Sequence, residues 1–287
     1  MNKAGFKFSI PFVVSFKEHL DGLVCSCIEE TATEIFCFFH DGKEDIISIK
    51  SVHESLDEEF LNSLKFLLHW TKEVLDLNDQ FIKIQFRNQY SVHPTAYCTG
   101  IIYSLFQLSK SKDKPDYLNL VNRGHDFLLQ NSFDVDRLLY YTYMLGGTRF
   151  DIGNELNPVR VSFPKGYEVV LVRKERFSGP PEEEGNAYDC KKALSLYHGL
   201  FFSDWKAICF GLQSCQPLPI SGTVRSYIED RGFNFLQIHS GYICFVFQNS
   251  LLSSDFLEVL AQSGLLQPDE NRDFIISKFS DEGIKLY

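Results

Sequence analysis

The sequence is short of positive charge: 28 lysines and arginines stand against 38 acidic residues, which gives a formal net charge of −10. Nucleic-acid phosphates are bound through an excess of lysine and arginine, so this balance argues against a nucleic-acid partner. No run of residues is long and uncharged enough to cross a membrane, and no small-residue cleavage pattern follows the first apolar stretch. We therefore expect a cytoplasmic protein that binds neither nucleic acid nor membrane.

The chain also lacks the cysteine spacings of a metal site or a disulfide framework. Its eight cysteines form no Cys-x-x-Cys pair and lie mostly in apolar runs, at positions 25, 27, 37, 98, 190, 209, 215 and 244. This pattern is typical of buried, reduced thiols in an intracellular protein. We expect no metal ligands among them.

Hydrophobic residues make up 44% of the chain and aromatic residues 15%, as in a globular protein. A length of 287 residues favours two lobes, and the alternation of strand runs with helix pairs predicts an α+β fold rather than repeated β-α-β units. We expect an N-terminal lobe over 1–163 and a C-terminal lobe over 164–287. A final strand is predicted over 272–279.

Four strands are predicted in the first fifty residues, over 6–16, 22–28, 33–39 and 45–51. Asp41-Gly42 between the last two predicts a tight hairpin, because glycine adopts the positive φ that such turns need. Helical spacing then predicts helices over 55–77, from about 95 onward, over 116–130 and over 134–145, with a strand over 81–88 before the second helix.

Glu18, His19 and Asp21 lie within four positions between two predicted strands. A solvated turn carries such residues at no cost, and local chemistry favours that interpretation. The alternative is that the two carboxylates and the imidazole converge on the hydroxyls of a polyol.

Asp134 and Asp136 lie where a helix is predicted to begin, and either carboxylate can cap it. If Asp134 caps the helix, Asp136 is left to accept a hydroxyl proton during phosphoryl transfer. Earlier in the sequence, a strand, a polar turn and a helix follow one another around His93, Thr95 and Thr99. This order is typical of a phosphate site.

The order of these features resembles the galactokinase branch of the GHMP small-molecule kinases. "FKEHLDG" is similar to that family's Gly-Glu-His-x-Asp-Tyr sugar motif, "QNSFDVDRLL" to Cys-Gly-Ile-Met-Asp-Gln, and "NAYDCKKAL" to Tyr-Asn-x-Arg-Arg. The ending "FIISKFSDEGIKLY" is similar to the family's closing strand and turn. The matches run in the same order from about residue 8 to the C-terminus.

The resemblance implies a two-lobed GHMP-kinase fold, with an N-terminal lobe like domain 2 of ribosomal protein S5, a ferredoxin-like C-terminal lobe and a cleft between them. It also implies ATP and magnesium as cofactors. The roles that it implies are the catalytic base for Asp136, sugar contacts for Glu18, His19, Asp21 and Tyr188, and nucleotide contacts for Thr95 and Thr99.

The departures from the family fall on the nucleotide side. The family's transfer-supporting arginine corresponds to Phe12, and its glycine-rich loop Gly-x-Gly-Leu-Ser-Ser-Ser-Ala corresponds to "SVHPTAYCTG", in which Pro94 also lacks an N–H. The third motif, Gly-x-Gly-Phe-Gly-Gly, corresponds to "IHSGYI". Two hypotheses therefore stay open: a divergent, galactokinase-like ATP-dependent sugar kinase, and a catalytically inactive pseudokinase that senses a ligand or binds a protein partner.

Overall fold

The computed structural model describes most of the N-terminal half and parts of the C-terminal half of the chain. The described ranges are 5–16, 24–50, 57–90, 92–109, 114–151, 158–161, 166–173, 194–195, 198–199, 201–202, 204, 206–207, 227, 238–239, 242–247, 250–263 and 274–287. The chain forms two compact units that are discontinuous in sequence. Unit 1 contains Met1–Val13, Glu30–Gly146 and Glu282–Tyr287, and unit 2 contains Val14–Glu29 and Gly147–Asp281.

The helices of unit 1 pack on a sheet with the strand order β11-β1-β2-β4-β3. Its strands are β1 (Gly5–Phe16), β2 (Val24–Phe39), β3 (Ile46–Lys50), β4 (Ile82–Asn88) and β11 (Lys285–Leu286). β4 pairs antiparallel with β2 and parallel with β3, and β11 pairs antiparallel with β1. The run 272–279, which was predicted as the final strand, forms β10 (Phe274–Lys278) in the sheet of unit 2, and the short strand β11 that follows it lies in unit 1.

Two expectations for this sheet are wrong. The runs 22–28 and 33–39 are parts of one strand, β2, whose first residues pair with β5 (Thr148–Phe150) and whose last residues pair with β4. The hairpin between 33–39 and 45–51 does not form, because β4 lies between β2 and β3. Gly42 is not among the positive-φ glycines of the described residues, and its N–H donates instead to Nδ1 of His40.

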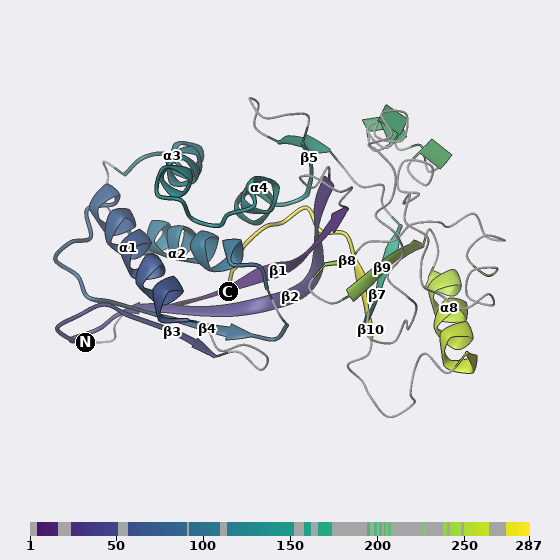
Figure 1. Ribbon diagram of the computed structural model, residues 1–287, viewed down its shortest axis with the longest axis horizontal. Coiled ribbons are helices and arrows are strands. Elements are labelled where there is room, and N and C mark those ends of the chain that lie inside the picture. The colour runs from purple at the N-terminus through teal and green to yellow at the C-terminus, as the bar shows by residue number, and fades with distance from the viewer. Residues whose placement is uncertain are drawn as a thin grey trace. The chain divides into compact units, whose positions relative to one another are not determined.

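Four helices lie on one face of this sheet (Figure 1), and they confirm the helices predicted from the sequence. They are α1 (Glu58–Val74), α2 (Thr95–Leu108), α3 (Tyr117–Gln130) and α4 (Arg137–Leu145). Three of them begin after an aspartate whose carboxylate accepts a backbone N–H of the first turn: Asp57, Asp116 and Asp136. These caps satisfy N–H groups that have no partner inside the helix.

α2 is the most deeply buried helix of unit 1, with eleven buried residues. It approaches the sheet most closely at Gly100, where an added Cβ would lie 2.7 Å from Cδ1 of Ile35 and 2.8 Å from Cε1 of Phe86. α3 approaches α4 closely at Gly124, where an added Cβ would lie 2.6 Å from Oη of Tyr140. These two glycines thus serve close packing of helices.

Unit 2 contains a four-stranded antiparallel sheet in the order β10-β7-β9-β8. Its strands are β7 (Glu168–Arg173), β8 (Ile238–His239), β9 (Tyr242–Phe247) and β10 (Phe274–Lys278), and helix α8 (Ser250–Gln262) contacts β7 and β9. Phe256 of α8 is fully buried, with ring centroids 4.6 Å from Phe245 and 5.1 Å from Phe247. β5 pairs with β6 (Val159–Val161) and with the start of β2 in the same unit. The predicted lobe boundary at 163/164 lies outside the described residues.

The described cysteines are free and buried: Cys25, Cys27, Cys37, Cys98 and Cys244. Burial raises the pKa of the Cys98 thiol to about 12, so this thiol stays protonated near neutral pH. Within the described ranges, no group of three or more cysteine, histidine or acidic side chains is arranged to hold a metal ion. None of the helices described is long and apolar enough to cross a bilayer.

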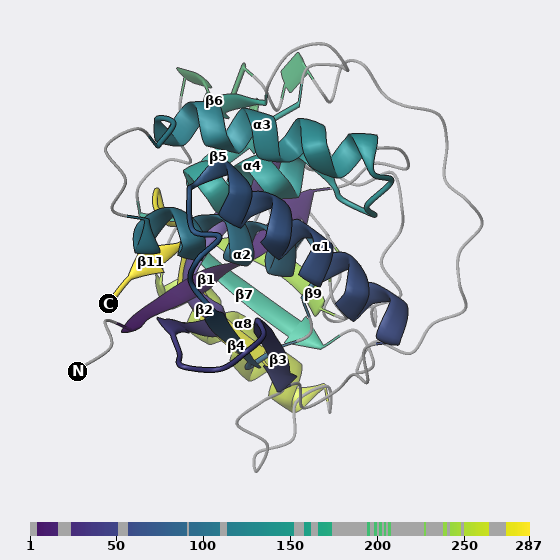
Figure 2. The same ribbon diagram turned by 90° about the vertical axis from the view of Figure 1, so that its left-hand side faces the viewer.

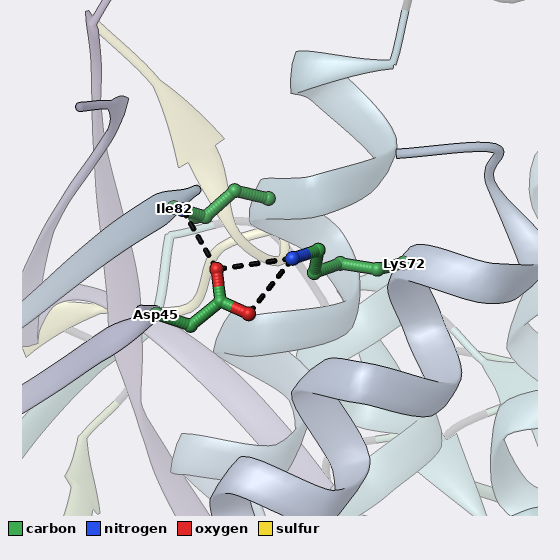
Figure 3. A network of polar contacts seen from close by, with 3 residues as sticks. All are labelled: Asp45, Lys72 and Ile82. Atoms are coloured by element: carbon green, nitrogen blue, oxygen red, sulfur yellow. Dashed lines mark hydrogen bonds and ion pairs between the residues drawn. The ribbon is translucent and has the colours of Figure 1, made fainter. Parts of the chain in front are cut away.

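A partly buried ion pair joins the end of α1 to the starts of β3 and β4 (Figure 3). Nζ of Lys72 lies 2.8 and 3.1 Å from the two carboxylate oxygens of Asp45, and Oδ1 of Asp45 also accepts the Ile82 N–H at 2.8 Å. The Lys72 side chain is 5% exposed and that of Asp45 23%. The Asp45 carboxylate therefore supplies the counter-charge for the Lys72 ammonium and the acceptor for the Ile82 N–H.

We expect Asp45→Ala to lower the free energy of unfolding by about 3 kcal/mol, because it leaves the Lys72 ammonium buried without its counter-charge. Lys72→Met should cost only about 1 kcal/mol, since the remaining carboxylate is partly solvated and keeps the Ile82 N–H. Urea denaturation of both variants checks this asymmetry. Equal losses would contradict it.

His125 of α3 is 5% exposed, and its ring centroid lies 5.4 Å from that of Tyr140 and 5.2 Å from that of Tyr141. Its Nε2 has no hydrogen-bond partner in the part of the chain that the structure describes. Burial, aided by the charge of Arg137, lowers the pKa of His125, although Asp126 raises it. The neutral ring is the form that this packing favours.

We expect the unfolding free energy to rise with pH up to about 6.5, the pKa of an unfolded-state histidine, because below it the unfolded chain binds the proton more readily. Above that pH the contribution of His125 is constant. His125→Phe should flatten the slope of unfolding free energy against pH between pH 5 and 7 in urea titrations. An unchanged slope in His125→Phe would contradict this role.

Candidate functional site at the starts of α2 and α4

The structure brings together two of the predicted site residues, which lie at the starts of two helices of unit 1 that pack on each other. The backbone N–H of Asp136, at the start of α4, donates to Oγ1 of Thr95, at the start of α2, over 3.1 Å. Thr95 is fully buried. The predicted catalytic base and a predicted nucleotide residue are thus neighbours, although 41 positions separate them.

His93 completes this cluster in a way that the sequence did not reveal. Its Nδ1 lies 2.8 Å from Oγ1 of Thr95 and accepts the Thr95 N–H at 3.3 Å. Because Nδ1 accepts the Thr95 N–H, it carries no proton, so the Thr95 hydroxyl donates to it. The geometry therefore assigns the neutral tautomer with its proton on Nε2.

The backbone N–H groups at the start of α2 all donate within their own turn. The Thr95 N–H donates to His93 Nδ1, the Ala96 N–H to the His93 carbonyl at 2.9 Å, and the Tyr97 N–H to the Pro94 carbonyl at 3.0 Å. Pro94, the residue before the helix, has no N–H to offer. A phosphate needs several such donors, so the turn as it stands does not form a cradle for a triphosphate.

Asp136 itself caps α4: its Oδ1 accepts the Leu139 N–H at 2.9 Å. The choice left open between Asp134 and Asp136 is thereby decided for Asp136, and Asp134 is exposed. The backbone N–H of the same residue bonds Oγ1 of Thr95, so the starts of α2 and α4 are joined at Asp136.

Thr99 lies one turn further along α2 and is fully buried. Its Oγ1 donates to the carbonyls of Thr95 at 3.0 Å and Ala96 at 2.9 Å. This side chain is therefore bound to its own helix, and its predicted contact with a nucleotide has no support in its hydrogen bonds.

Phe12, which stands where the resemblance expects an arginine, is 2% exposed. Its ring meets that of Tyr90 edge to face at 5.5 Å, and the Tyr90 hydroxyl donates to Glu30 at 3.0 Å. The position is thus built for aromatic packing, and its side chain brings no positive charge to a transferring phosphoryl group.

The remaining predicted site residues are Glu18, His19, Asp21 and Tyr188, and they lie outside the described residues. Sequence reasoning missed a buried polar chain beneath the start of α2, in which Thr33 donates to Asn88 and Asn88 to the Tyr97 hydroxyl. Tyr97 also contacts Phe60 of α1 at 5.8 Å, which places the acidic first turn of α1 beside this end of α2.

No protein-family model matches this chain, and no curated protein matches it by sequence. Solved structures do match over nearly the whole length. A homoserine kinase from Cytophaga hutchinsonii has a TM-score of 0.71 at 14% identity, covering 100% of this chain and 98% of that one. A phosphotransferase related to the CoA biosynthesis pathway has a TM-score of 0.64 at 12% identity, covering 99% of both chains.

Mevalonate diphosphate decarboxylase from Enterococcus faecalis has a TM-score of 0.62 at 10% identity, again covering 99% of both chains. A further solved structure, that of MDDEF in complex with MVAPP, AMPPCP and magnesium, has a TM-score of 0.60 at 10% identity and covers 99% of both chains. Likeness at such low identity is a likeness of fold. It confirms the predicted α+β fold of the GHMP-kinase type.

The Thr95 hydroxyl should matter for stability because it satisfies the Asp136 N–H. We expect Thr95→Val to lower the unfolding free energy by about 2 kcal/mol, since it leaves a partly buried N–H without its acceptor. Thr95→Ser, which keeps the hydroxyl, should recover most of this loss. Thr99→Val is the matched control, with an expected loss below about 1 kcal/mol, and urea denaturation measures all three. A similar loss in Thr95→Val and Thr99→Val would contradict the bridging role.

Proposed function

We propose that this chain is a GHMP-fold pseudokinase: a protein that binds a small hydroxyl-bearing ligand and no longer transfers phosphoryl groups from ATP efficiently. The observation that carries the proposal is the start of α2. There the N–H groups of Thr95, Ala96 and Tyr97 donate to His93 and Pro94, so a nucleotide phosphate would have to displace contacts that already exist.

Two further features support loss of transfer. Phe12 occupies the position of the expected arginine, and a single arginine that stabilises the transition state of phosphoryl transfer is worth several powers of ten in rate. Glu58 and Glu59 begin α1 beside Tyr97 and bring negative charge to this side of α2, while the first residue of α4 is Arg137. Both features disfavour a polyphosphate near this end of α2.

The ligand proposed for this protein is a sugar or a similar polyol. Glu18, His19, Asp21 and Tyr188 are the residues that the sequence resemblance assigns to its hydroxyls. Carboxylates and an imidazole accept and donate several hydrogen bonds at once, which suits a ligand with neighbouring hydroxyl groups. We propose that the protein acts in the cytoplasm, as a ligand sensor or in contact with a protein partner.

The second candidate is an active, galactokinase-like sugar kinase that uses ATP and magnesium. The specific observation in its favour is the hydrogen bond between the Asp136 N–H and Thr95, because it joins the proposed base residue to the start of α2. In that case Asp136 would accept the proton of the substrate hydroxyl. The fold neighbours, which include phosphotransferases, are consistent with it.

Thermal unfolding with ligands separates the two candidates. A nucleotide bound with a Kd one hundredth of its concentration would stabilise the chain by about 2.7 kcal/mol and raise its Tm by several degrees. We expect 2 mM Mg-ATP to leave the Tm unchanged, while one member of a panel of hexoses, polyols, homoserine and mevalonate raises it.

Asp136→Asn is the matched control, because asparagine keeps the helix cap and loses the basic carboxylate. A phosphorylated product formed by the unchanged protein and absent with Asp136→Asn would overturn the pseudokinase proposal and establish the kinase. Equal ligand-induced Tm shifts in both proteins, with no product from either, would support it.

A further inference from the structure

A hollow of about 560 Å³ opens on the surface of unit 1, at the first turns of α1. We call it the α1 hollow. Its walls come from the first turns of α1 and from the connection between α3 and α4, and its lining residues are Glu58, Glu59, Asn62, Ser63, Phe66, Asn131 and Phe133. Figure 2 shows α1 and α3 as neighbouring parts of the helical layer.

The apolar side of the α1 hollow is aromatic and partly uncovered. The Phe66 side chain is 48% exposed, and its ring centroid lies 5.4 Å from that of Phe127. Phe127 stacks on Trp70 at 4.3 Å and reaches toward Phe133 at 6.3 Å. Because the four rings support one another from behind, the outward faces of Phe66 and Phe133 are held in place for a ligand.

The polar side of the α1 hollow is acidic. Glu58 and Glu59 are exposed in the first turn of α1, where the helix dipole stabilises negative charge. No lysine or arginine within the described ranges forms an ion pair with either carboxylate, and none lies over the ring of Phe66 or Phe133. Aromatic faces next to unpaired carboxylates recognise an organic cation, because the cation pairs with the acids and rests on the rings.

We propose that the α1 hollow docks a protein partner through an arginine or lysine side chain on a basic segment of that partner. An arginine fits best, since its planar guanidinium stacks on an aromatic ring while its edge bonds a carboxylate. The net charge of −10 would also steer a basic partner toward the chain. A second copy of this chain fits poorly, because it would bring the same two carboxylates against each other.

The inference shares Glu58 and Glu59 with the argument against nucleotide binding, but it uses none of the proposed sugar-binding residues, so its failure can be told apart from failure of the proposed ligand site. Trp70, which stacks behind the hollow, is a built-in reporter because its fluorescence responds to changes at the neighbouring rings. The probe is the capped peptide Ac-(Arg-Ala)4-NH2, titrated into the full chain at 50 mM salt. We expect saturable binding that weakens as salt is raised to 300 mM.

The decisive variants separate the hollow from general attraction to an acidic protein. Glu58→Gln/Glu59→Gln and, separately, Phe66→Ala should each weaken peptide binding at least tenfold. The matched control is Glu73→Gln/Asp79→Asn, which removes the same charge from exposed positions of unit 1 outside the hollow. It should change the affinity less than twofold, and circular dichroism verifies that all variants are folded.

Three outcomes would overturn the proposal. Equal weakening by the two double variants would mean that only overall charge attracts the peptide. Binding of agmatine as tight as that of the peptide would assign the hollow to a free small cation. Dimerisation in sedimentation experiments that Phe66→Ala abolishes, with no peptide binding, would assign the hollow to a second copy of the chain.

Discussion

The close approach of α2 to the sheet at Gly100 is the constraint on which the organisation of unit 1 depends. Without a side chain at this point, the helix sinks between Ile35 and Phe86, and eleven of its residues become buried. The helix start is thereby held at a fixed depth. Thr95 at that start then positions α4 through the Asp136 N–H, and α3 packs in turn at Gly124.

Deep burial also explains why the backbone N–H groups at the start of α2 are paired within their own turn. Backbone N–H groups removed from water must find partners, and a loop that keeps them for a ligand relies on glycine and on solvent access. Here the His93 ring and carbonyl and the Pro94 carbonyl supply those partners. A phosphate at this position would have to replace the hydrogen bonds that stabilise the turn.

Charge is distributed to a similar effect around this end of unit 1. Asp57 caps α1 and is followed by Glu58 and Glu59, while Asp136 caps α4. Acidic residues at helix starts stabilise the helices by themselves. The acidic first turn of α1 is therefore shared by two proposals, the pseudokinase interpretation of α2 and the docking of a basic segment at the α1 hollow.

Local patterns were sufficient for the helices and the α+β class, because helical periodicity depends on residues within a few positions of one another. Strand pairing was not accessible in this way. The Asp41-Gly42 turn predicted a hairpin, yet β4, from beyond α1, lies between β2 and β3. Likewise, Asp136 and Thr95 were each plausible site residues from their own surroundings. Only the packing of α2 and α4 on each other brought Asp136 and Thr95 into contact, with the Thr95 hydroxyl also bonded to His93. Hydrogen bonds across long sequence separations depend on the depth and angle at which helices pack.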